Sequence, residues 1–119
     1  MVVGNKRRDL MKELRVKLGQ VELQVRDSEG KSEAIIFLHF SGANLMMRQR
    51  VLPYFHEHYR MILVDLRGHG KSDVPESGYH MDVMAQDLIG IMDQLGIEKA
   101  HLLGSSLGAE VGLSLAANH

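Results

Sequence analysis

Gly104-Ser105-Ser106-Leu107-Gly108 is the stretch that decides the fold of this chain. It follows a short apolar run, Ala100 to Leu103, and precedes a segment rich in alanine and leucine. Two glycines spaced in this way around a serine allow a strand to turn sharply into a helix, with the central hydroxyl raised above the sheet. The G-x-S-x-G pattern therefore predicts a strand, a tight turn and a helix, with Ser106 at the turn as a candidate nucleophile.

The residues before this turn predict alternating strands and helices. Polar and apolar residues alternate over 14–18 and 21–25 on either side of Gly19 and Gln20, which predicts a β-hairpin. Continuous apolar runs predict strands over 34–38, 61–64 and 100–103, and helices are expected over 45–59, 80–96 and 106–118, the first of them interrupted by Pro53. This order predicts an α/β fold whose sheet is parallel in its later part.

Composition indicates a soluble globular protein of one ordinary domain, with 119 residues, 45% of them apolar and 24% charged. The net charge of −1 gives no basis for binding nucleic acid. The absence of cysteine excludes disulfides and thiolate metal sites. The sequence has no secretory signal pattern and no apolar run long enough to span a membrane, so a cytoplasmic location is the expectation.

Two other kinds of site are considered and set aside. His56 and His58 are close in sequence, but residues two apart on a helix do not face each other, so no metal site is predicted. Gly70-Lys71-Ser72 resembles the end of a phosphate-binding loop. That motif requires glycine at the position of Asp65 and a helix after the loop, so nucleotide binding is not predicted either.

Three segments in the same order and spacing resemble the α/β-hydrolase family, and the resemblance covers roughly residues 12–119. The first is Phe37-Leu38-His39-Phe40-Ser41-Gly42, which is similar to the oxyanion loop after the third strand of that fold. The second is the run from Val64 to Asp73, which is similar to its D-x-R-G-x-G-x-S turn. The third is the G-x-S-x-G stretch itself. The resemblance implies an α/β-hydrolase sheet, truncated after the nucleophile turn and the helix that follows it.

The resemblance also implies the roles of the site residues. Ser106 would be the nucleophile that attacks an ester-type or related acyl bond, and the backbone N–H groups of Leu107 and of Phe40 or Ser41 would bind the oxyanion. No metal or organic cofactor is implied, and the partner would be a small-molecule acyl substrate of the full-length parent. Phe40 departs from the family pattern, which usually has glycine there. Serine rather than aspartate at the turn argues against the haloalkane dehalogenase and epoxide hydrolase branches.

Several neighbouring residues are assigned structural rather than chemical tasks. His39 is expected to support the oxyanion loop. Asp65, Arg67 and His69 are expected to form hydrogen bonds that hold their turn together. Two glycines four positions apart, Gly108 and Gly112, are expected to allow the last helix to pack closely on the sheet.

The sequence does not supply the acid and the histidine that follow the serine in such an enzyme. Of the 119 − 106 = 13 residues after Ser106, Glu110 is one helical turn away and too weak a base, and His119 would lie about 20 Å away along a helix.

Residues 1–11 are therefore interpreted as an extension and 12–119 as the N-terminal part of an incomplete hydrolase domain. That interpretation predicts an inactive isolated chain. The alternatives are a noncatalytic fragment that pairs through an exposed sheet edge, including self-association, or a decayed gene product.

Overall fold

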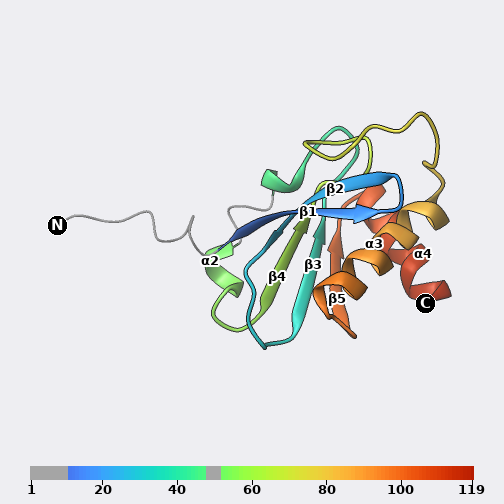
Figure 1. Ribbon diagram of the computed structural model, residues 1–119. Coiled ribbons are helices and arrows are strands. Elements are labelled where there is room, and N and C mark those ends of the chain that lie inside the picture. The colour runs from blue at the N-terminus through green and yellow to red at the C-terminus, as the bar shows by residue number, and fades with distance from the viewer. Residues whose placement is uncertain (1–10, 48–51) are drawn as a thin grey trace.

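The computed structural model describes residues 11–47 and 52–119 and contains a mixed five-stranded sheet with two long helices on one face (Figure 1). The strands are β1 (Lys12–Leu18), β2 (Val21–Asp27), β3 (Ala34–Leu38), β4 (Arg60–Val64) and β5 (Ala100–Gly104). The helices are α2 (Leu52–Phe55), α3 (Met81–Leu95) and α4 (Leu107–Asn118). Among the described residues, no helix is both long and apolar enough to cross a membrane.

The strands are arranged in the order β1-β2-β4-β3-β5. β1 and β2 form an antiparallel hairpin, β2 is antiparallel to β4, and β3 is parallel to both β4 and β5. Leu38, the last residue of β3, pairs with Val64 on one side and with Gly104 on the other. The carboxyl ends of the three parallel strands therefore meet at one edge of the sheet, where ligands bind in open α/β sheets.

The expected hairpin is confirmed, and each of its strands is two residues longer than predicted. β1 begins at Lys12 rather than Leu14, and β2 ends at Asp27 rather than Val25. Gly19, in the two-residue turn, has a φ of 64°, in the left-handed region that glycine adopts without a steric penalty.

The larger hydrophobic core lies between the sheet and the two long helices. Ile36, Leu38, Ile62 and Val64 point from the central strands into this core, because alternate residues of a strand face the same side. The predicted apolar stripe on the second helix is confirmed, since Met84, Leu88 and Ile91 are buried there and Met81, Met92 and Leu95 pack against them. The helix begins one residue later than predicted and ends at Leu95. Gly96, the predicted stop, caps it in the left-handed conformation with a φ of 69°.

A smaller core covers the opposite face of the sheet. The buried side chains of this core come from β3, from β4 and from the segment that links these strands. They include Ile35, Phe37, Met61, Leu63, Leu45 and Leu52. The prediction of a helix over 45–59 is only partly right. Residues 45–47 form a 3₁₀ turn and α2 spans four residues, whereas 48–51 lie outside the described residues. Pro53 lies in the first turn of α2, where its missing N–H removes no helical hydrogen bond.

A buried ion pair joins the turn after β4 to α3. Both nitrogens of the Arg67 fork donate to Asp87, with Nε–Oδ2 at 2.7 Å and Nη2–Oδ1 at 2.8 Å. The two side chains are 10% and 7% exposed. Hydrogen bonding to Asp87 raises the pKa of the Arg67 guanidinium despite the opposing effect of burial, so the arginine stays charged and paired.

We expect replacement of Asp87 by alanine to lower the free energy of unfolding by about 3–5 kcal/mol, because it leaves a buried guanidinium without its partner. Urea unfolding followed by circular dichroism measures the change. The matched control is Glu22→Gln, which removes the charge from an exposed pair with Arg15 at 3.1 Å and should cost at most about 1 kcal/mol. Equal losses in the two variants would contradict the assignment of the Arg67–Asp87 pair as a structural anchor.

Candidate active site

The predicted turn between β5 and α4 has the strained backbone expected for an exposed nucleophile. Ser106 lies between the end of β5 at Gly104 and the start of α4 at Leu107, with φ 51° and ψ −113°. In the described residues, Ser106 and Glu29 are the two non-glycine residues with positive φ. Such a conformation costs on the order of 1–3 kcal/mol and persists where the surroundings enforce it. Ser106 is exposed and its side chain makes no capping hydrogen bond to α4.

The two outer glycines are required because backbone segments approach each other closely at this turn. A Cβ on Gly108 would lie 2.7 Å from the carbonyl oxygens of both Leu38 and His39, and a Cβ on Gly104 would lie 2.7 Å from the carbonyl carbon of Gly108. These distances are too short for any side chain. The expected packing role is therefore confirmed for Gly108. It is wrong for Gly112, where a Cβ would make ordinary contacts at 3.7–3.9 Å with the side chains of Leu38 and Leu102.

The close contact of Gly108 with Leu38 and His39 brings the loop after β3 next to the start of α4. Phe40 to Ala43 form a tight turn in which the Ala43 N–H donates to the Phe40 carbonyl at 3.1 Å and Gly42 has a φ of 82°. Phe40 is 44% exposed. The candidate donors at Phe40 and Ser41 and the candidate donor at Leu107 thus lie on the two segments that contact each other.

His39 holds this loop in place and is buried, with 1% exposure. The Leu66 N–H donates to His39 Nε2 at 3.0 Å, so this nitrogen is the acceptor of a neutral ring. The proton is then on Nδ1, which donates to the Phe40 carbonyl at 2.8 Å. Because Nε2 is occupied by a backbone donor, His39 fits the expected supporting role rather than that of a base.

The backbone N–H groups of Phe40, Ser41 and Leu107 are available as hydrogen-bond donors in the described part of the chain. Within the described residues, no hydrogen-bond acceptor is found for the N–H groups of Phe40 and Ser41. Leu107 is the first residue of α4, where N–H groups have no intrahelical partner. The N-terminal end of the helix dipole adds a partial positive charge beside Ser106.

The turn after β4 is held by Asp65, which is 2% exposed. Its Oδ1 accepts from the Leu45 N–H at 2.6 Å and its Oδ2 accepts from the Lys71 N–H at 2.9 Å. His69 Nδ1 lies 3.0 Å from the Arg67 carbonyl oxygen. The expectation that the three residues hold the turn is confirmed for Asp65 and His69, whereas Arg67 binds Asp87 of α3 instead. Asp65 connects this turn to the loop after β3.

The two residues considered as partners for the serine are placed elsewhere. Glu110 is exposed in the first turn of α4, and its N–H donates to the Ser106 carbonyl at 2.9 Å. His119 lies at the far end of α4, where its Nε2 accepts from the Gln86 side-chain amide at 2.9 Å. The described residues thus bring together the candidate nucleophile and oxyanion donors without a histidine base. They also contain no group of three or more His, Asp or Glu residues arranged to hold a metal ion.

Comparison with known proteins identifies the family to which the chain belongs. The family model described as the alpha/beta hydrolase fold matches residues 33–119. The chain is 40% identical over 83 residues to 3-oxoadipate enol-lactonase 2 of Acinetobacter baylyi, an alignment that covers 70% of this chain and 31% of that protein. It is 34% identical over 105 residues to 2-(acetamidomethylene)succinate hydrolase of Mesorhizobium japonicum, covering 88% of this chain and 37% of that protein.

Solved structures show the same likeness. A candidate epoxide hydrolase from Pseudomonas aeruginosa superimposes with a TM-score of 0.84 and 31% identity, covering 92% of this chain and 37% of that one. The chain therefore spans between about 30% and 40% of the length of these similar proteins.

The two glycines of α4, Gly108 and Gly112, provide a matched test of the close contact between α4 and the end of β3. Gly108→Ala should lower the free energy of unfolding by about 1–3 kcal/mol, because its methyl group would collide with the carbonyls of Leu38 and His39. Gly112→Ala should raise it by about 0.5–1 kcal/mol, because alanine is the better helix former and its methyl group fits. Thermal unfolding of both variants measures the difference, and a stable Gly108→Ala protein would contradict the geometry of this turn.

Proposed function

We propose that this chain, which belongs to the α/β hydrolase fold family, carries the nucleophile and the oxyanion-binding backbone of a serine hydrolase. The relatives named above are hydrolases by name, which supports hydrolysis as the general reaction. The proposed reaction is cleavage of an ester-type or related acyl bond in a small molecule. It requires no metal or organic cofactor.

In the proposed mechanism, Ser106 Oγ attacks the acyl carbon while a base accepts the hydroxyl proton. The carbonyl oxygen becomes an oxyanion, which accepts hydrogen bonds from the N–H of Leu107 and from that of Phe40 or Ser41. Collapse of this intermediate expels the leaving group and forms an acyl-serine, which water then hydrolyses. The histidine base and its acidic partner would come from sequence beyond the part of the fold described here.

The observation that carries the proposal is the backbone of Ser106. A serine serving only to cap a helix would have an extended backbone and would accept a hydrogen bond from the first turn of the helix. Ser106 instead has positive φ and no capping bond, and the residue is exposed. This combination suits a nucleophile better than a helix cap.

The type of residue at the proposed nucleophile position also indicates which class of bond the enzyme would cleave. The similar Pseudomonas structure is described as a candidate epoxide hydrolase, so the shared fold does not separate that branch from the esterase-like branches. Serine at position 106, rather than aspartate, favours formation of an acyl-serine and hence a carboxylic ester, lactone or similar substrate. The presence of a lactonase among the similar proteins agrees with this choice.

We expect Ser106 to react covalently with a fluorophosphonate when the chain is fused to the part of the Mesorhizobium hydrolase that the alignment does not cover, which we propose as the source of the base. Peptide mass spectrometry identifies the labelled residue. Ser106→Ala should abolish labelling, and Ser105→Ala, which removes the neighbouring hydroxyl, should retain it. Labelling that survives Ser106→Ala would exclude Ser106 as the nucleophile.

A second candidate function concerns the chain on its own, namely self-association through β5. This strand is at the edge of the sheet, with Leu103 40% exposed. Beside it, an open hollow of about 340 Å³ is lined by small and apolar residues, including Leu102, Ala109, Leu113 and Ala116. Leu113 is 71% exposed. We propose that two copies pair β5 to β5 about a two-fold axis, because the same edge and hollow are then covered on both chains.

Sedimentation velocity across a range of concentrations tests this pairing. The unmodified chain should sediment increasingly as a dimer, and Leu113→Lys should shift it to monomer by placing a charge in the contact. Val74→Lys is the matched control, because Val74 is 72% exposed and lies on the loop after β4, away from this edge. A folded chain that remains monomeric at every concentration would refute self-association without affecting the role of Ser106.

A further inference from the structure

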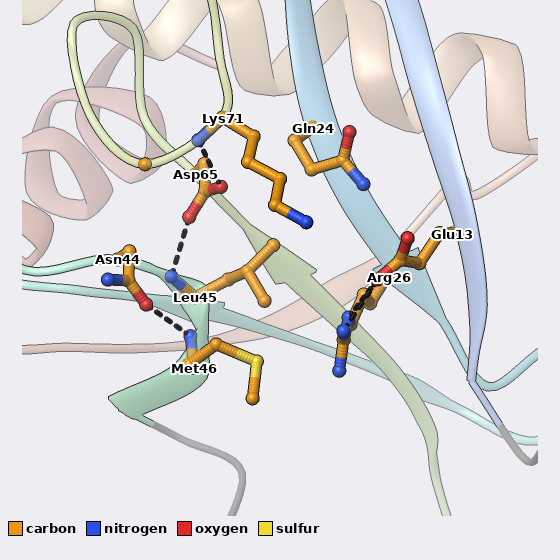
Figure 2. Close-up of a pocket in the computed structure, with 9 residues that line it drawn as sticks. Glu13, Gln24, Arg26, Asn44, Leu45, Met46, Asp65 and Lys71 are labelled. Carbon is orange, nitrogen blue, oxygen red and sulfur yellow. Dashed lines mark hydrogen bonds and ion pairs between the residues drawn. The ribbon is translucent and has the colours of Figure 1, made fainter. Parts of the chain in front are cut away.

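A second hollow lies on the other side of the sheet centre from Ser106. This cavity of about 140 Å³ opens between β1, β2 and the loops after β3 and β4, and its lining includes Gln24, Arg26, Asn44, Leu45, Met46 and Lys71 (Figure 2). In the strand order, β4 and β3 separate β2 from β5, so the cavity is distinct from the turn that carries Ser106.

The carboxylates around this cavity already have partners. Asp65 accepts from the Leu45 and Lys71 N–H groups, so both of its oxygens are occupied. Glu13 Oε1 accepts from Arg26 Nε at 3.0 Å and Nη2 at 2.5 Å, which pairs these two charges. The remaining charge is the ammonium of Lys71, which forms no ion pair with any described residue.

Gln24 adds an unsatisfied polar group. Gln24 is 7% exposed. Its backbone N–H donates to Ser72 Oγ and its carbonyl accepts from the Asp65 N–H, so both backbone groups have partners. Its side-chain amide has no hydrogen-bond partner in the described part of the chain, although Figure 2 shows it extending into the same space as the Lys71 side chain. A buried amide without a partner costs about 1–3 kcal/mol, so a group that enters the cavity and bonds to it is favoured.

We propose that this cavity binds a small organic carboxylate of two to four carbons. The carboxylate would accept hydrogen bonds from Lys71 Nζ and the Gln24 amide, and the short alkyl chain would contact Leu45 and Met46. The volume suits a ligand of this size, because sites for larger molecules occupy several hundred cubic ångströms. The proposal is independent of the chemistry assigned to Ser106.

Titration of the ¹⁵N-labelled chain with butyrate at constant ionic strength tests the site. We expect the Gln24 side-chain amide signals and the Lys71 backbone signal to shift and saturate at millimolar butyrate. Butyramide has the same shape without the charge and should produce no saturating shift. Linear shifts without saturation, or equal responses to both compounds, would overturn the proposal.

Two variants and a control assign the contacts. Lys71→Met keeps the backbone bond to Asp65 and the length of the side chain, and it should weaken butyrate binding about tenfold or more. Gln24→Glu keeps the shape of the side chain, adds a negative charge and should abolish binding. Lys31→Met, at an exposed lysine before β3, should bind as the unmodified chain does.

Unchanged affinity in Lys71→Met, with its amide spectrum otherwise preserved, would refute the assignment. Tighter binding of inorganic phosphate than of butyrate would refute the carboxylate class, since phosphate lacks the alkyl chain that Leu45 and Met46 are proposed to contact.

Discussion

The close approach of α4 to the end of β3 is the constraint on which the rest of this structure depends. Gly108 lies where any side chain would collide with the carbonyls of Leu38 and His39, so the helix starts directly above the central strand. Parallel pairing of β3 with β5 brings Leu38 opposite Gly104. The turn from β5 into α4 must therefore begin beside the last residue of β3. Ser105 and Ser106 alone connect β5 to α4, and α4 is held close to the end of β3. The strained backbone of Ser106 follows from this short connection.

Buried polar contacts turn the irregular loops at this edge into a fixed platform. His39 joins the loop after β3 to Leu66, Asp65 joins the turn after β4 to Leu45, and Arg67 joins the same turn to α3. Each contact satisfies a backbone or charged group that would be costly to bury alone. The loops therefore have defined positions without regular secondary structure, as a site that positions backbone N–H groups requires.

The sequence predicts the regular elements well because their signals are local. The hairpin about Gly19, the apolar stripe of α3 and the turn at Ser106 depend on residues close together in the chain, and each is observed. Prediction fails where the contact is distant. The pairing of Arg67 with Asp87 spans 20 residues, and the different roles of Gly108 and Gly112 depend on what lies opposite each of them. The unsatisfied amide of Gln24 becomes visible when its surroundings are known.

The geometry also separates the positioning of the proposed nucleophile from its activation. A strained backbone conformation persists when its surroundings leave no alternative, and for Ser106 those surroundings are β3, β5 and α4. The candidate oxyanion donors are held by the same elements and by His39. Every contact that fixes the proposed nucleophile thus comes from the described residues, whereas the base that would remove its proton does not. A base supplied from further along the fold would meet a serine whose backbone is already fixed, so its own task would be reduced to proton transfer.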